Sequence, residues 1–203
     1  AYYASKRFDT NFVTTFHGTY NYKDFIKKKY NSIMTKGKRV IAISKFIKNH
    51  IIEKYGIEAD KIVKIPRGID LNSFDPTKVS HERIIQLSNS WRLPDGTQII
   101  MLPGRLARWK GHKVLIEALG KLKRRDFRCI FVGSELGNEN NKKYLIKIIR
   151  ENNLSELVQF VNHCNDMPAA YMLSDVVVSA STDPEAFGRV SVEAQAMNRI
   201  IIA

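Results

Sequence analysis

Two cations and two carboxylates in the second half of the chain have the types and spacing to hold a phosphorylated ligand. Arg105 and Lys110 follow a short apolar run and precede a stretch of helical periodicity. Glu185 and Glu193 stand in a similar position further along, with seven residues between them. Fixed cations beside a helix N-terminus attract phosphate oxygens, and a carboxylate accepts hydrogen bonds from a vicinal diol. These residues therefore indicate binding of a ligand that carries both phosphates and sugar hydroxyls.

Each of the four also has a plainer interpretation. Arg105 and Lys110 fit solvated surface charges, the usual role of such residues. Glu193 fits an exposed helix charge, and Glu185 fits a first-turn acid favoured by the helix dipole. The spacing alone leaves both interpretations open.

Glycines and histidines in the same loops are further candidates. Gly104 and Gly133 lie in the loops after expected strands. Gly188 would let the backbone approach a diphosphate closely, although a simple turn glycine fits equally well. His17 and His163 also follow expected strands, and the residues alone favour a structural role for both. No trio of His, Cys, Asp or Glu has the spacing of metal ligands, so no metal is expected.

The elements that would position these residues form an alternating pattern. From residue 97 onward, apolar runs rich in β-branched residues alternate with stretches of helical periodicity, which predicts an α/β, doubly wound parallel sheet of Rossmann-like type. Ligands bind such sheets outside the carboxyl ends of the strands, where the candidate residues lie. The expected strands are residues 98–102, 128–132, 157–161, 175–179 and 199–203, and the expected helices are about 111–124, 141–151, 167–173 and 188–197.

Residues 1–66 form a different block. Residues 11–16 and 39–44 resemble buried strands, Ser44 is a good N-cap for a helix closed by Gly56, and a further strand is expected at 62–65. These strands are too few for a core like that of residues 81–203, so we expect the remnant of a second Rossmann-like domain. Residues 67–80, rich in Asp, Asn, Gly and Pro, are expected to be a linker.

The composition limits the partners and the location. The chain has 203 residues with 33 Lys and Arg against 20 Asp and Glu, and most of the +13 excess lies in the first third. We expect no nucleic acid partner, because charge is its only support. The two cysteines favour a reducing, cytoplasmic location, no apolar run is long enough to span a bilayer, and residues 1–10 lack the layout of a secretory signal. The lysines and arginine at 27–29, 36, 38 and 39 fit either a solvated face or docking on an anionic membrane surface.

Three segments together resemble the retaining nucleotide-sugar glycosyltransferases of family 4, which have the GT-B fold. The segment at 185–197, Glu-Ala-Phe-Gly-Arg-Val-Ser-Val-Glu-Ala-Gln-Ala-Met, resembles the family's E-x7-E segment. The segment at 104–111, Gly-Arg-Leu-Ala-Arg-Trp-Lys-Gly, resembles its G-R-L-x-x-x-K-G segment. Residues 40–44 and 66–70 resemble its interdomain passage.

The resemblance implies roles for the candidate residues. Arg105 and Lys110 would neutralise the leaving diphosphate in place of a metal. Glu193 would bind the ribose hydroxyls, and Glu185 the hydroxyls of the donor sugar. The backbone around Phe187 and Gly188 would bind phosphate or sugar. His17 matches a family histidine that faces the donor sugar, which reverses the preference for a structural role.

The activity implied is retaining transfer of a hexosyl group from a UDP- or GDP-linked sugar to a glycan or lipid-linked acceptor, as in lipopolysaccharide or cell-envelope glycan biosynthesis. The acceptor hydroxyl would attack from the face that the diphosphate leaves, without a protein nucleophile. The family's first half-domain and its C-terminal end are expected to be missing from this chain. The alternative is therefore a catalytically inactive fragment that at most binds nucleotide sugar.

Overall fold

The computed structural model describes residues 1–134 and 139–203. By its internal contacts the chain divides into two compact units, each of which has its own sheet. The first unit comprises Ala1–Gly68 together with Glu185–Gly188. The second comprises Ile69–Pro184 and Arg189–Ala203.

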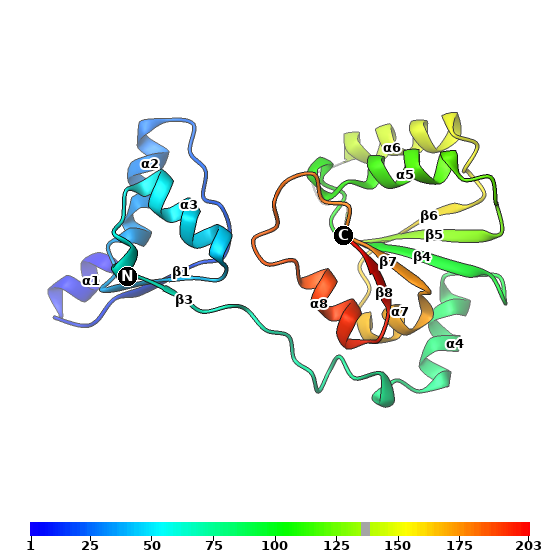
Figure 1. The fold of residues 1–203 in the computed structure, drawn as a ribbon, viewed down its shortest axis with the longest axis horizontal. Coiled ribbons are helices and arrows are strands. Elements are labelled where there is room, and N and C mark those ends of the chain that lie inside the picture. Colours follow the sequence, from blue (N-terminus) through cyan, green and yellow to red (C-terminus); the bar gives the residue numbers. More distant parts are fainter. Residues whose placement is uncertain (135–138) are drawn as a thin grey trace. The chain divides into compact units, whose positions relative to one another are not determined.

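The first unit contains a three-stranded parallel sheet in the order β1-β2-β3 (Figure 1). Its strands are β1 (Val13–Phe16), β2 (Arg39–Ala42) and β3 (Ile62–Lys64). The prediction of a buried strand at residues 11–16 is wrong for most of β1, where Val13 is 51% exposed and only Phe16 is fully buried. The reason is that β1 lies at an edge of this sheet, a position that composition does not reveal.

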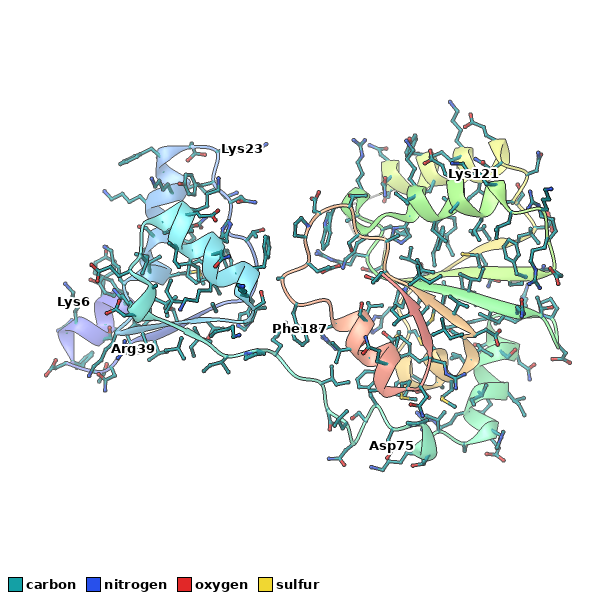
Figure 2. All side chains as sticks on the ribbon, viewed as in Figure 1. Lys6, Lys23, Arg39, Asp75, Lys121 and Phe187 are labelled. Atoms are coloured by element: carbon teal, nitrogen blue, oxygen red, sulfur yellow. The ribbon has the colours of Figure 1, made fainter. Side chains whose placement is uncertain are left out.

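Three α-helices belong to the first unit, namely α1 (Tyr2–Arg7), α2 (Phe25–Asn31) and α3 (Lys45–Tyr55). The expected helix corresponds to α3: Ser44 Oγ accepts a hydrogen bond from the Ile47 N–H, and Gly56 ends the helix in the left-handed conformation. Buried residues of α3 pack on β2 in a small core, and Figure 2 shows the side chains of this unit. Short 3-10 turns, η1 (Ser32–Thr35) and η2 (Ala59–Lys61), precede β2 and β3.

The second unit contains a five-stranded, all-parallel sheet in the order β6-β5-β4-β7-β8. The five expected strands are confirmed, each to within one residue at either end. They are β4 (Gln98–Pro103), β5 (Phe127–Val132), β6 (Val158–Val161), β7 (Val176–Val178) and β8 (Ile200–Ile202).

Helices cover both faces of this sheet, as a doubly wound topology requires. In Figure 1, α5 (His112–Lys121) and α6 (Glu139–Glu151) lie on one face, and α7 (Met167–Leu173) and α8 (Arg189–Ala196) lie on the other. Two separate apolar clusters match these layers, one with Leu115 and Leu145 and one with Tyr171 and Met197. The predicted α/β fold class is confirmed.

Residues 69–90 lead into the second sheet. They contain a 3-10 turn, η3 (Pro76–Lys78), and a helix that the sequence reading did not predict, α4 (His81–Ser90). Arg83 of α4 makes two hydrogen bonds, of 2.9 and 2.7 Å, to the carboxylate of Asp166, which also caps the N-terminus of α7. This pair ties α4 to α7.

Candidate functional site

Backbone hydrogen bonds join the loops at the carboxyl ends of β4, β5 and β6. The Gly104 N–H donates to the Val132 carbonyl at 2.8 Å, and the Gly133 N–H donates to the Val161 carbonyl at 3.0 Å. Two residues further along both loops, the Leu106 N–H donates to the Ser134 carbonyl at 3.2 Å. The sheet hydrogen bonding thus continues past the strand ends and fixes the loops that carry the candidate residues. We call these strand ends and the loops after them the strand-end edge.

Gly133 allows an unusually close approach at the strand-end edge. A methyl group on its Cα would lie 2.1 Å from the Gly104 carbonyl oxygen and 3.1 Å from the Arg105 nitrogen. Any side chain here would push the loops after β4 and β5 apart. The structure therefore brings Gly104, Gly133 and the backbone of Arg105 together.

A second set of contacts joins the loop after β7 to the turn before α5. This turn is η4 (Arg108–Lys110), and the Trp109 carbonyl accepts a 2.8 Å hydrogen bond from the Thr182 N–H. Gly111 caps α5 with a φ of +73°, and a methyl group on it would lie 1.6 Å from the Ala180 carbonyl oxygen. The loops after β4 and β7 therefore touch through their backbones at the point where the strand order reverses, the usual ligand position in such sheets.

The two candidate cations lie on this fixed framework. Arg105 is exposed in the loop after β4, and Lys110 is half-buried at the end of η4. The Lys110 side chain passes Gly104, where an added methyl group would meet its Cδ at 3.5 Å, and its Nζ lies 4.3 Å from the centre of the Trp109 ring. The contact with Trp109 limits the positions that the ammonium group can take.

Glu193 has a different environment from the exposed helix charge that its spacing allowed. It is the fifth residue of α8 and only 5% exposed, so that interpretation is wrong. Oε1 accepts hydrogen bonds from Arg189 Nη2 and Nε at 2.6 and 3.0 Å, and Oε2 accepts one of 2.8 Å from Tyr171 Oη. Burial and the nearby Glu193 carboxylate raise the pKa of Tyr171, which keeps its hydroxyl protonated and donating.

The sequence reading missed both partners of this carboxylate. Arg189 stands four residues before Glu193, so it could have been found from the helical spacing. Tyr171 lies on a different helix, and no local pattern connects it with Glu193. The hydrogen bond from Tyr171 to Glu193 joins α7 to α8.

The remaining candidates lie in loops. Glu185, Phe187 and Gly188 are half-buried and belong by their contacts to the first unit, and Gly188 has a φ of +79° directly before α8. His17 is exposed directly after β1, and His163 is exposed in the loop after β6.

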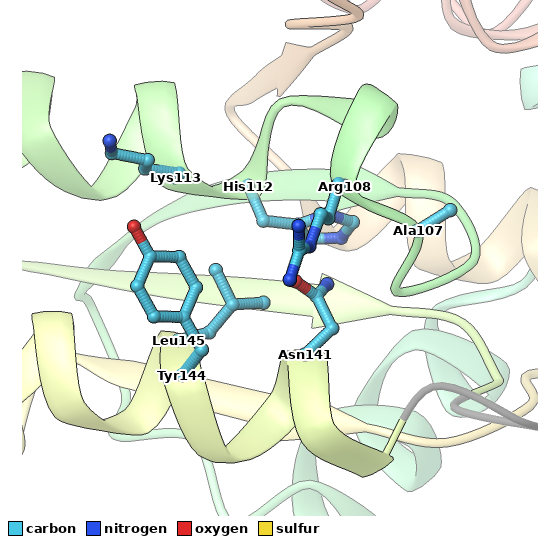
Figure 3. Close-up of a pocket in the computed structure, with 7 residues that line it drawn as sticks. All are labelled: Ala107, Arg108, His112, Lys113, Asn141, Tyr144 and Leu145. Carbon is cyan, nitrogen blue, oxygen red and sulfur yellow. The ribbon is translucent and has the colours of Figure 1, made fainter.

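A pocket of about 380 Å³ lies between α5 and α6 (Figure 3). Its described lining consists of Ala107, Arg108, His112, Lys113, Asn141, Tyr144 and Leu145, which includes none of the predicted site residues. His112 is 1% exposed, and neither of its ring nitrogens has a hydrogen-bond partner within the described part of the chain. Burial, with a smaller effect from the Lys110 charge, lowers its pKa to about 4, so the ring is neutral at pH 7.

Within residues 1–134 and 139–203 there is no group of three or more His, Cys, Asp or Glu side chains that could hold a metal ion. In the same ranges, no helix has the length and apolar content needed to cross a membrane.

An all-parallel sheet with helices on both faces defines a doubly wound protein of the α/β class, in which ligands bind at the strand-end edge. The model of the family "Glycosyl transferases group 1" matches residues 84–203, and that of "Glycosyltransferase Family 4" matches residues 1–73. The chain therefore belongs to the group 1 glycosyl transferases. The predicted resemblance to family 4 and the GT-B type of fold are confirmed.

Solved structures and curated relatives agree with this assignment. A glycosyltransferase from Rickettsia africae has a TM-score of 0.89 and 43% identity over 100% of this chain and 53% of its own. HepE from Anabaena, solved with UDP and glucose, has a TM-score of 0.87 and 26% identity over 100% of this chain and 55% of its own. The D-inositol 3-phosphate glycosyltransferase of Corynebacterium aurimucosum is 29% identical over 75% of this chain and 37% of its own length. The chain thus spans well under half the length of that curated relative.

Proposed function

We propose that this protein transfers a hexosyl group from a nucleotide-sugar donor to an acceptor hydroxyl with retention of configuration. The observation that carries the proposal is the strand-end edge, where Gly104 and Gly133 meet and the Lys110 side chain passes directly over Gly104. This edge offers backbone approach and positive charge at one place. HepE, which binds UDP and UDP-glucose, has the same fold over the whole of this chain, and this similarity supports a UDP- or GDP-linked donor.

In the proposed reaction, the bond between the sugar and the diphosphate breaks while the acceptor oxygen bonds to the same sugar carbon from the same face, and the proton of the acceptor hydroxyl passes to the departing diphosphate. Negative charge grows on the leaving diphosphate, so groups that stabilise it lower the barrier. Arg105 and Lys110 supply this stabilisation, and such preorganised donors contribute about 3 kcal/mol each in enzymes of known mechanism. With two cations in this role, the proposed mechanism needs neither a metal nor a protein nucleophile.

Glu193 is proposed to bind the ribose hydroxyls of the donor. Arg189 and Tyr171 hold its two oxygens in place, and each carboxylate oxygen can accept more than one hydrogen bond. A carboxylate fixed in this way is preorganised for a vicinal diol. Glu185, His17 and the backbone at Phe187 and Gly188 are proposed to contact the donor sugar and phosphates, with support from the family resemblance. His163 is proposed to contact the donor from the loop after β6.

The acceptor is proposed to be a glycan or lipid-linked glycan of the cell envelope, in the cytoplasm and at the inner face of a membrane. The support is the basic character of the first unit, which carries most of the excess charge of the chain. Anionic lipid attracts such a surface by about 1 kcal/mol per well-placed cation. No nucleic acid partner is proposed.

The test is a comparison of Lys110→Ala with Lys113→Ala. Both variants remove one lysine near the start of α5, but Lys113 pairs with Glu117 on the helix surface, at 3.5 Å. We expect Lys110→Ala to reduce the rate of UDP- or GDP-sugar hydrolysis or transfer by about 100-fold, the usual cost of one such group. Lys113→Ala should keep the original rate.

Two results would contradict the proposal. Turnover unchanged by Lys110→Ala would remove the leaving-group role. Binding of UDP- or GDP-sugars in calorimetry with no turnover in the original chain would instead favour the inactive, nucleotide-sugar-binding alternative. Glu185→Gln and His17→Ala, measured in the same assay, test the two roles that rest on the resemblance.

A further inference from the structure

The pocket between α5 and α6 contains a buried histidine whose ring nitrogens have no partner. His112 is 1% exposed, and within residues 1–134 and 139–203 neither Nδ1 nor Nε2 makes a hydrogen bond. The ring stands edge-on to that of Phe131, with the two ring centres 5.0 Å apart, so packing holds it in place. Buried polar groups without a partner cost free energy, and most of them in folded proteins are paired. The two nitrogens therefore indicate a polar guest in the pocket.

The hollow that His112 lines is large enough for a small molecule. Its volume is about 380 Å³, which lies within the range of about 300–1,000 Å³ for small-molecule sites. Leu145 and the ring of Tyr144 form an apolar part of its wall (Figure 3). None of the residues proposed to bind the donor is among its described lining residues. We call this hollow, a candidate site separate from the strand-end edge, the α5–α6 pocket.

The lining of the α5–α6 pocket is positively charged. Arg108 is exposed on its wall, and no hydrogen bond or ion pair joins it to another residue within the described ranges. Lys113 also lines the pocket, but it is paired with Glu117 at 3.5 Å. No carboxylate is among the described lining residues, so the Arg108 guanidinium is the group that would attract an anion.

Two helices begin at the α5–α6 pocket and add to its preference for an anion. His112 is the first residue of α5, and Asn141 is the third residue of α6. Helix N-termini favour negative charge, because their first N–H groups lack partners within the helix. Asn141 Nδ2 donates a 2.6 Å hydrogen bond to the Leu106 carbonyl, which fixes this buried amide. In Figure 3 the side chains of Arg108 and Asn141 point toward one another across the pocket.

The neutral ring of His112 requires more of a ligand than negative charge. Because burial lowers the pKa of His112 to about 4, one ring nitrogen donates a hydrogen bond at pH 7 and the other accepts one. An oxyanion can accept from the first nitrogen but has no proton to give to the second. A hydroxyl group can supply that proton. The chemistry of the pocket thus fits a molecule that carries both an oxyanion and hydroxyl groups.

We propose that the α5–α6 pocket binds a small organic anion with hydroxyl groups, namely a phosphorylated or carboxylated polyol. The Arg108 guanidinium pairs with the oxyanion, since its planar fork matches the oxygens of a phosphate or a carboxylate. One nitrogen of His112 accepts a hydrogen bond from a ligand hydroxyl, and the other donates to a ligand oxygen. The ring of Tyr144 packs against the carbon skeleton. This binding site goes beyond the proposed function, because it lies apart from the donor and needs no turnover.

The first test is calorimetry of the purified chain at pH 7 with three probes: ribose 5-phosphate, gluconate and ribose. We expect at least one of the two anions to bind, and the tighter of them identifies the oxyanion. Ribose, which lacks the charge, should bind about tenfold more weakly or less. Arg108→Gln should weaken binding of the anion by about tenfold or more. The control is Arg150→Gln, which makes the same change in net charge on an exposed residue in the last turn of α6.

The second test asks whether the ligand reaches the buried ring. His112→Phe keeps an aromatic ring against Phe131 but removes both nitrogens, and it should weaken binding by about fivefold or more. The control His81→Phe changes an exposed histidine of α4 and should keep the original affinity. The chain has 5 histidines, so the ring ¹⁵N signals that disappear in His112→Phe belong to His112. These signals should shift when the anion binds to the original chain, and circular dichroism checks the fold of each variant.

Four results would overturn the proposal. They are no binding of either anion by the original chain, equal losses in Arg108→Gln and Arg150→Gln, and ring signals of His112 that do not move when the anion binds. The fourth is a loss of binding in Lys110→Ala but not in Arg108→Gln, which would place the anion at the strand-end edge. None of these measurements reads nucleotide-sugar turnover, so the α5–α6 pocket and the proposed function stand or fail separately.

Discussion

Gly111 offers a direct test of how the strand-end edge is built. The glycine lies against the Ala180 carbonyl oxygen, and a methyl group on it would be only 1.6 Å from that oxygen. Ordinary van der Waals contact begins at 3.4 Å, so Gly111→Ala requires the two backbones to separate by about 3.4 − 1.6 = 1.8 Å. The substitution adds one carbon atom but displaces the loop after β7.

The size of the effect follows from two contributions. Alanine in the left-handed conformation costs about 1–2 kcal/mol, and steric overlap in a packed region costs about 1–3 kcal/mol more. Gly96 provides the matched control, because its φ of +68° is nearly that of Gly111 but an added methyl group there has no atom within 4 Å. We therefore expect Gly111→Ala to lower the free energy of unfolding by about 2–5 kcal/mol and Gly96→Ala by about 1–2 kcal/mol.

Urea denaturation followed by circular dichroism measures both variants, and the second unit contains both positions. The difference between the two losses of unfolding free energy measures the steric overlap at Gly111, because both variants share the same backbone strain. Equal losses of stability in Gly111→Ala and Gly96→Ala would refute the claim that the loops after β4 and β7 are in close backbone contact.

Two further predictions concern buried polar groups. His112 has a pKa of about 4 in the folded protein against 6.5 in the unfolded chain, so its contribution to stability is complete above pH 6.5 and is lost as the pH falls toward 4, by about 3 kcal/mol in total. Denaturation measured between pH 7 and 4 should show this loss of stability in the original chain and a smaller loss in His112→Leu. Tyr171→Phe removes the only hydrogen bond described at Glu193 Oε2 and should lower the free energy of unfolding at pH 7 by about 1–3 kcal/mol. The control Tyr144→Phe, on an exposed residue, should change it by less than about 0.5 kcal/mol. Equal effects of the two substitutions would show that the hydrogen bond between Tyr171 and Glu193 contributes no net stability.

The strands and crossover helices of the second unit could be predicted because their signals are local. Runs such as Val176–Val178 are rich in β-branched residues, and α5 repeats apolar residues every three or four positions. The helix α4 escaped prediction although Ser80 caps it, because the preceding residues have the composition of a linker. The helices α1 and α2 were missed because they are short and bury almost no apolar side chains.

For the candidate site, the sequence by itself determined the residue types at the strand-end edge: the cations Arg105 and Lys110, the glycines Gly104 and Gly133, and a carboxylate at 193. Their order along the chain and their positions after parallel strands follow from periodicity and turn residues. These are short-range properties, which neighbouring residues express whatever the rest of the fold does.

Only the tertiary structure decided which groups touch. The strand order β6-β5-β4-β7-β8 brings Gly111 against Ala180 and the Thr182 N–H to the Trp109 carbonyl, although these residues are far apart in sequence. The packing of α7 and α8 also buries Glu193 and brings Tyr171 within hydrogen-bond distance of its carboxylate, although the helical spacing alone allowed an exposed side chain. Such contacts depend on how whole elements pack, because burial and close approach arise when the core excludes water and are not encoded in any one segment.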